Sequence, residues 1–118
     1  MGYEELKVYR DTLALLLRVS KLSETLDDSK VPDLKSLKGE LVDAMTCILR
    51  ANEWSDGEEQ IRYAVEHIAR ARIWIRLLFE SREISCYAYL QISKTTSSIQ
   101  GQMLEWHKLR GIKWPNGT

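Results

Sequence analysis

Residues that break helices are rare in this chain, and long stretches free of them separate the few that occur. Pro32 and Pro115 are the only prolines among 118 residues. Four predicted helices fit between the breaks, at about residues 3–25, from just after Pro32 to 53, from 55 or 56 to 82, and from 85 to 110. Short connections between long helices favour antiparallel neighbours. We therefore expect an all-α fold, an antiparallel up-and-down four-helix bundle over residues 1–111, with a short C-terminal tail at 112–118.

Capping signals support the last two of these helices. Ser55 or Asp56 can cap the third helix, and Glu58 and Glu59 then place acidic groups in its first turn, near the positive end of the helix dipole. Ser85 is the expected N-cap of the fourth helix.

Charge and composition exclude several classes of protein. Seventeen basic and seventeen acidic residues cancel, so no overall field directs the chain to a polyanion. No apolar run is long enough to span a membrane, and the acidic N-terminus does not resemble a signal peptide. We expect a cytoplasmic protein that does not contact membranes. Cys47 and Cys86 have no Cys-x-x-Cys partner, which favours two reduced thiols.

The residues that catalysis or metal binding would need do not form a recognisable motif. Di-iron bundles use Glu-x-x-His pairs, but His67 directly follows Glu66, and His107 stands two residues after Glu105. No glycine-rich phosphate loop is present. We expect no enzyme activity, no cofactor and no metal, with His67 on a helix surface and His107 in a basic C-terminal end.

Two predicted helices are apolar on more than one face. In the third helix, one apolar stripe has the spacing of a side that faces a bundle core; it consists of Ile61, Ala64, Val65, Ile68, Ala71, Ile75, Leu78 and Phe79. The remaining large apolar residues of that helix point away from this stripe. The first helix carries one stripe at Leu6, Tyr9, Leu13, Leu16 and Leu17 and a second at Val8, Leu15, Val19, Leu22 and Leu26. Helices that touch two neighbours explain part of this surplus. Exposed apolar clusters usually mark protein interfaces, so we also predict a homo-oligomer whose interface is Val8, Leu15, Val19, Leu22, Ile73, Trp74 and Leu77.

Arginines are concentrated in the third predicted helix. Arg72 lies within its core stripe, where the stem can pack while the head reaches solvent, or the head can pair with an acid of a facing helix; the candidates are Asp11, Glu40 and Asp43. Alternatively, Arg72 acts with Arg70, Arg76 and Arg82 to hold phosphates.

Four segments carry a resemblance to a known family. They are Tyr3–Arg10 (YEELKVYR), Ile48–Asn52 (ILRAN), Ala71–Phe79 (ARIWIRLLF) and Ile99–Trp106 (IQGQMLEW). Their order and spacing resemble the four-helix bundle accessory proteins of diversity-generating retroelements, the accessory variability determinant (Avd) type. These proteins are relatives of the bundle proteins encoded in ribosomal-RNA intervening sequences. The resemblance spans about residues 3–111.

The resemblance implies a noncatalytic accessory role. Members of the family form homopentamers that bind the retroelement reverse transcriptase and its template RNA, or an RNA/DNA hybrid, and support mutagenic cDNA synthesis. If nucleic acid is bound, we expect the phosphate contacts to come from Arg10, Arg18, Arg70, Arg76 and Arg82. This chain departs from the family in its neutral charge, in an acidic cluster, and near its late tryptophan; the departing residues are Glu53, Asp56, Glu58, Glu59, Leu104 and Glu105. The alternative is a stand-alone protein-interaction bundle that binds no nucleic acid.

Overall fold

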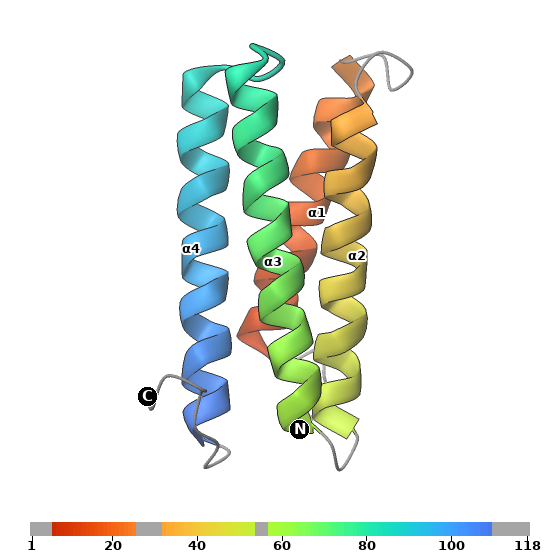
Figure 1. The fold of residues 1–118 in the computed structure, drawn as a ribbon, viewed down its shortest axis with the longest axis vertical. Helices are drawn as coiled ribbons and strands as arrows, with labels where there is room; N and C mark the ends of the chain where they lie inside the picture. The colour runs from red at the N-terminus through yellow and green to blue at the C-terminus, as the bar shows by residue number, and fades with distance from the viewer. Residues whose placement is uncertain (1–5, 26–31, 54–56, 110–118) are drawn as a thin grey trace.

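The computed structural model describes residues 6–25, 32–53 and 57–109. It contains four α-helices, namely α1 (Lys7–Thr25), α2 (Pro32–Glu53), α3 (Gly57–Glu80) and α4 (Cys86–Leu109), and no strand within those residues. Consecutive helices run in opposite directions along one long axis (Figure 1). The predicted all-α four-helix bundle is confirmed. The predicted tail at 112–118 and the caps Ser55 and Asp56 lie outside the described residues.

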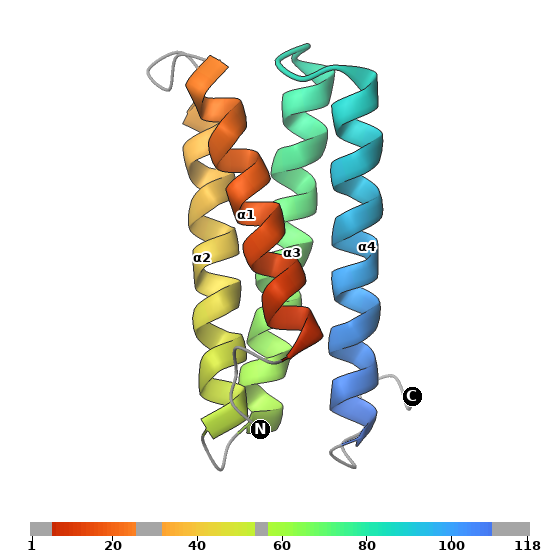
Figure 2. The same cartoon turned by 180° about the vertical axis from the view of Figure 1, so that it is seen from behind.

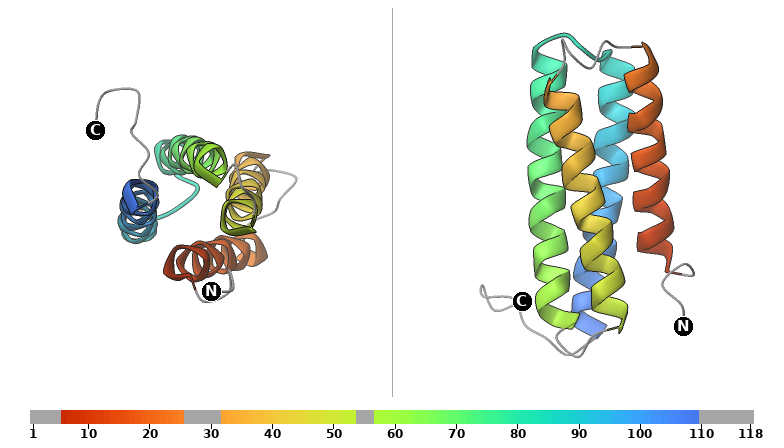
Figure 3. Two further views of the ribbon diagram at one scale, coloured as in Figure 1. Left: turned by 90° about the horizontal axis from the view of Figure 1, so that it is seen from below. Right: turned by 90° about the vertical axis from the view of Figure 1, so that its right-hand side faces the viewer.

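The helices stand at the corners of a square when the bundle is seen end on, with α1 diagonally opposite α3 (Figure 3). The pair α2 and α3 packs most extensively. Helix α1 is inclined to the others, so that its first turns approach α4 and its last turns lie against α2 (Figure 2). The seam between α1 and α4 is consequently the loosest of the four.

The core is a continuous column of aliphatic side chains along the bundle axis. Complete burial of such a side chain stabilises the fold by roughly 1.5–3 kcal/mol. The largest fully buried side chains of this core are Leu15, Leu34, Leu37, Leu41, Ile48, Ile61, Ile68, Ile75, Leu78, Ile92, Ile99 and Met103. The stripe predicted for α3 faces this core, with Val65 and Phe79 only partly buried at its edge.

The interface predicted on α1 was wrong for three of its residues. Val8, Leu15 and Val19 are buried in the bundle core, and Leu22 is partly buried against it. In the other α1 stripe, Leu13 and Leu17 reach solvent, with Leu17 56% exposed, whereas Leu6, Tyr9 and Leu16 are partly buried against the core. Because Val8, Leu15 and Val19 point at the bundle axis, they are unavailable to a second copy.

The turn between α3 and α4 is a Schellman motif closed by a residue other than glycine. The backbone N–H of Glu83 donates to Leu78 O at 2.8 Å, and that of Arg82 donates to Phe79 O at 2.9 Å. Arg82 has a φ of 62°, a left-handed conformation that is unfavourable for a residue with a Cβ atom. The predicted N-cap of α4 is confirmed, since Ser85 Oγ accepts a hydrogen bond from the Ala88 N–H at 3.1 Å.

His107 and Cys47 are buried, whereas Cys86 is exposed. His107 is fully buried, which corrects its expected place in an exposed basic end, because its position on α4 follows the core residues Ile99 and Met103 at helical spacing. Both cysteines are free thiols, Cys86 exposed and Cys47 buried. Burial raises the pKa of the Cys47 thiol.

Candidate interaction surfaces

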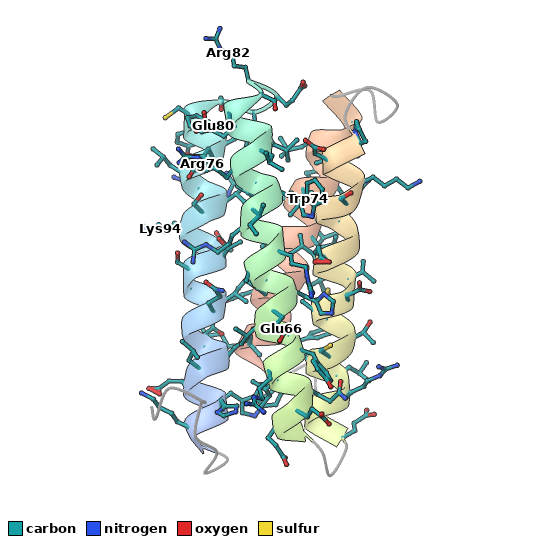
Figure 4. The ribbon with its side chains drawn as sticks, viewed as in Figure 1. Glu66, Trp74, Arg76, Glu80, Arg82 and Lys94 are labelled. Atoms are coloured by element: carbon teal, nitrogen blue, oxygen red, sulfur yellow. The ribbon has the colours of Figure 1, made fainter. Side chains whose placement is uncertain are left out.

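An exposed apolar surface lies on the outer side of α3 and α4. Ile73 and Leu77, one turn apart on α3, are 61% and 42% exposed, and Leu90 on α4 is 58% exposed. We call these three residues the α3–α4 apolar face. Trp74, which was predicted to share this surface, is partly buried against the core on the α2 side of α3 (Figure 4). Sequence reasoning missed Leu90.

Aromatic and polar contacts fix α3 beside α4 at this surface. The rings of Phe79 and Tyr89 stack with their centroids 4.3 Å apart. Arg76 Nη1 donates to the Tyr89 hydroxyl at 3.1 Å, and Arg76 Nη2 lies 2.7 Å from Glu80 Oε1. The Tyr89 hydrogen bond, together with the Glu80 charge, raises the pKa of the Arg76 guanidinium. The stretches that carry Leu77 and Leu90 are therefore held side by side.

The five arginines predicted to bind nucleic acid do not form one surface. Arg70, Arg76 and Arg82 are exposed along or just beyond α3, whereas Arg10 and Arg18 are exposed on α1, diagonally across the bundle. Figure 4 shows Arg82 projecting from the end of the bundle. One nucleic-acid segment cannot contact both sets on one face of a single protomer.

Three arginines of α3 contact neighbouring side chains. Arg70 Nη2 lies 4.0 Å from Glu66 Oε2, and Arg76 pairs with Glu80. Arg72 was predicted to lie in the core stripe, but it is exposed at the seam between α3 and α4. Its Nη1 donates to Gln100 Oε1 at 2.6 Å rather than to any of the acids considered.

Helix α1 carries a straight row of exposed cations. Lys7, Arg10, Arg18 and Lys21 recur at helical spacing on one exposed side of the helix, and we call them the α1 basic stripe. At about 1.5 Å per residue, the stripe is about 21 Å long. Lys7 Nζ also contacts Asp11 Oδ2 at 2.8 Å. Sequence reasoning selected the two arginines and missed the lysines, which the spacing alone could have identified.

An apolar groove of about 460 Å³ opens between α1 and α4. Its lining is Leu6, Lys7, Val8, Ser98, Gly101, Gln102, Glu105 and Trp106. Next to it, Gln102 Nε2 donates to Asp11 Oδ2 at 2.7 Å, a contact that ties α4 to α1. The hydrogen bond from Lys7 and that from Gln102 together lower the pKa of the Asp11 carboxyl.

Acidification should weaken the native protein more than its Asp11→Asn variant. A carboxyl with a lowered pKa in the folded state stabilises the fold above its unfolded pKa, and this stabilisation is lost as the pH falls through the folded value. The expected window lies below about pH 4, the ordinary range of aspartate. Thermal unfolding measured between pH 7 and pH 2.5 should show the two curves converging at low pH. Parallel curves would contradict the contribution of Asp11.

None of the helices, over the part of the chain that the structure describes, offers the continuous apolar length that a bilayer-spanning segment requires.

Comparisons with known proteins identify the fold alone. No protein-family model matches the chain, and no curated protein sequence matches it. A solved structure of a protein of unknown function from the S23 ribosomal protein family of Bacteroides thetaiotaomicron, at 1.70 Å resolution, superposes with a TM-score of 0.78. The match covers 86% of this chain and 95% of that one at 16% sequence identity. The two chains share the four-helix bundle architecture.

Proposed function

We propose that this protein is a noncatalytic assembly subunit that forms a homo-oligomer and binds a reverse transcriptase complex of a diversity-generating retroelement. The observation that carries the assembly part is the α3–α4 apolar face. The reverse transcriptase is proposed from the resemblance of the four sequence segments to Avd-type proteins. Template RNA is the proposed polyanionic partner of the α1 basic stripe.

The apolar face favours assembly because its side chains are large and are held on two neighbouring helices. Each of these side chains exposes apolar surface to water. Covering that surface with a partner would stabilise the complex by roughly 25 cal/mol per Å². The contacts of Phe79, Tyr89 and Arg76 order this surface before a partner arrives, which lowers the entropy cost of association. The five-fold oligomer remains a proposal from the resemblance.

The double variant Ile73→Glu/Leu77→Glu should dissociate the oligomer. Burying two new carboxylates in an apolar interface is strongly unfavourable, and both positions are exposed within one protomer, so the fold should survive. Multi-angle light scattering at micromolar concentration should report an oligomer for the native protein and a monomer for the variant, with equal helical content by circular dichroism.

Val42→Glu provides the matched control. Val42 is 49% exposed on α2, away from the α3–α4 apolar face. It should leave the oligomer intact. A native protein that is monomeric, or a double variant that stays assembled, would reject assembly through this face.

The partner is tested by co-purification. If the gene lies beside a reverse-transcriptase gene and a template repeat, the tagged native chain should retain the reverse transcriptase from cell extracts. Retention after RNase treatment would indicate a direct protein contact, and loss after RNase would indicate an RNA bridge. Failure to retain the enzyme under either condition would instead support a stand-alone interaction bundle.

A further inference from the structure

Three side chains with metal-ligating atoms meet on the seam between α2 and α3. Glu40 and Asp43 are one turn apart on α2, and His67 comes from the facing part of α3. One ligand atom of each lies within 4.8 Å of those of the other two. We infer that this cluster binds a divalent transition metal ion of the zinc type. An imidazole nitrogen with two carboxylate oxygens is a donor set that suits zinc.

The state of Glu40 is an independent indication of a cation-binding site. Its Oε2 atom is buried and has no hydrogen-bond partner within the described residues. Its Oε1 atom lies 3.6 Å from His67 Nδ1, beyond an ordinary hydrogen-bond distance. Leaving a buried carboxylate oxygen without a partner is costly. A metal ion bound by both carboxylate oxygens of Glu40 and by His67 would satisfy Oε2 and hold the two helices together.

The geometry and charge of the cluster fit a small ion. Ligand atoms about 2.0–2.2 Å from a tetrahedral zinc lie about 3.3 Å from one another, so modest side-chain rotations would close the cluster. Asp43 is exposed and can make the largest adjustment, leaving one coordination position for water. Two carboxylates balance the charge of a divalent cation. Magnesium is less suited because it prefers six oxygen ligands.

Arg70 is the competitor of the metal ion at this cluster. Its Nη1 atom lies 3.4 Å from His67 Nδ1, the nitrogen that faces Glu40. The Arg70 side chain is 53% exposed and already approaches Glu66 on the same helix, so it can move away without losing all its contacts. Removing the Arg70 guanidinium should therefore favour metal binding.

Titration of the full chain with Zn²⁺ and, separately, Co²⁺ tests the site. One equivalent per chain should bind, tetrahedral Co²⁺ should give its visible absorption bands, and the melting temperature should rise with free metal concentration. His67→Ala and Glu40→Gln should each weaken metal binding by about tenfold or more. Loss of a residue that only hydrogen-bonds to a metal ligand already has an effect of that size, and these two residues would be ligands themselves. Arg70→Ala should tighten it.

Two variants serve as matched controls. Glu105→Gln removes an exposed acid of α4, the helix diagonally opposite α2, and Cys86→Ser removes the exposed thiol; both should bind metal as the native chain does. His67→Gln, which keeps a polar side chain of similar size, guards against misfolding in His67→Ala. Absence of one-equivalent binding, unchanged affinity in His67→Gln and Glu40→Gln, or loss of binding in Cys86→Ser would overturn the inference. Light scattering of the same variants separates this result from the oligomer, which the site does not require.

Discussion

Leu15→Ala should destabilise the fold by about 2–5 kcal/mol, whereas Leu17→Ala should change the stability of the protomer by less than about 1 kcal/mol. Leu15 is 1% exposed within the core, and Leu17, two residues later on the same helix, is 56% exposed. Truncating the buried side chain removes its transfer free energy and leaves a cavity in the bundle core. Native stability is typically about 5–15 kcal/mol, so the loss is a large fraction of the total.

Chemical denaturation and thermal unfolding measure this difference. The melting temperature of Leu15→Ala should fall by roughly 10–20 °C. The pair is matched in residue type, helix and substitution, so burial is the only major difference between the two positions. Equal losses at both positions would contradict the orientation of α1, in which Leu15 is buried and Leu17 is exposed.

The architecture was predictable because local signals agree along the chain. Breakers near Pro32 and around Ser85 set the helix ends, and the α3 stripe has one continuous apolar side, so its burial follows from spacing alone. Capping by Ser85 is likewise a local property. Each of these inferences needs only residues within one or two helical turns.

The orientation of α1 was not predictable in this way. Its two apolar stripes have the same periodicity, and the rotation of α1 about its own axis decides which of their residues are fully buried. His107 illustrates the same limit, because neighbouring cations suggest a solvated end while its helical position places it with Met103 in the core.

Contacts between helices were the least accessible to sequence reasoning. Arg72 donates to Gln100 across the α3–α4 seam, and Gln102 donates to Asp11 across the α1–α4 seam. These partners depend on the rotation of each helix about its own axis. The spacing of Glu40 and Asp43 on α2 was visible beforehand, but nothing in the sequence places His67 opposite them.

Neutralising the α1 basic stripe should reduce RNA affinity far more than neutralising the arginines of α3. Lys7 already lies beside Asp11, so three cations of the stripe are available to phosphates. Three contacts to single-stranded phosphates would give a slope of about −2.1 in a plot of log affinity against log salt, or about a twenty-fold loss between 50 and 200 mM. Arg10→Ala/Arg18→Ala should remove about two-thirds of that slope. Arg70→Ala/Arg76→Ala should change it little, because Glu66 and Glu80 already lie beside those two guanidinium groups.

Fluorescence anisotropy with a labelled template RNA, over a series of salt concentrations, distinguishes these outcomes. The chain has no net charge, so attraction to RNA has to come from a local arrangement, and the α1 basic stripe is the row in which cations line one exposed helix side. Assembly strengthens the argument, because several copies would present several stripes to one RNA and multiply a weak contact. The monomeric Ile73→Glu/Leu77→Glu protein should therefore bind RNA more weakly than the native protein despite its intact stripe. Binding that is insensitive to salt, or that depends on Arg70 and Arg76 alone, would place the RNA elsewhere or remove it as a partner.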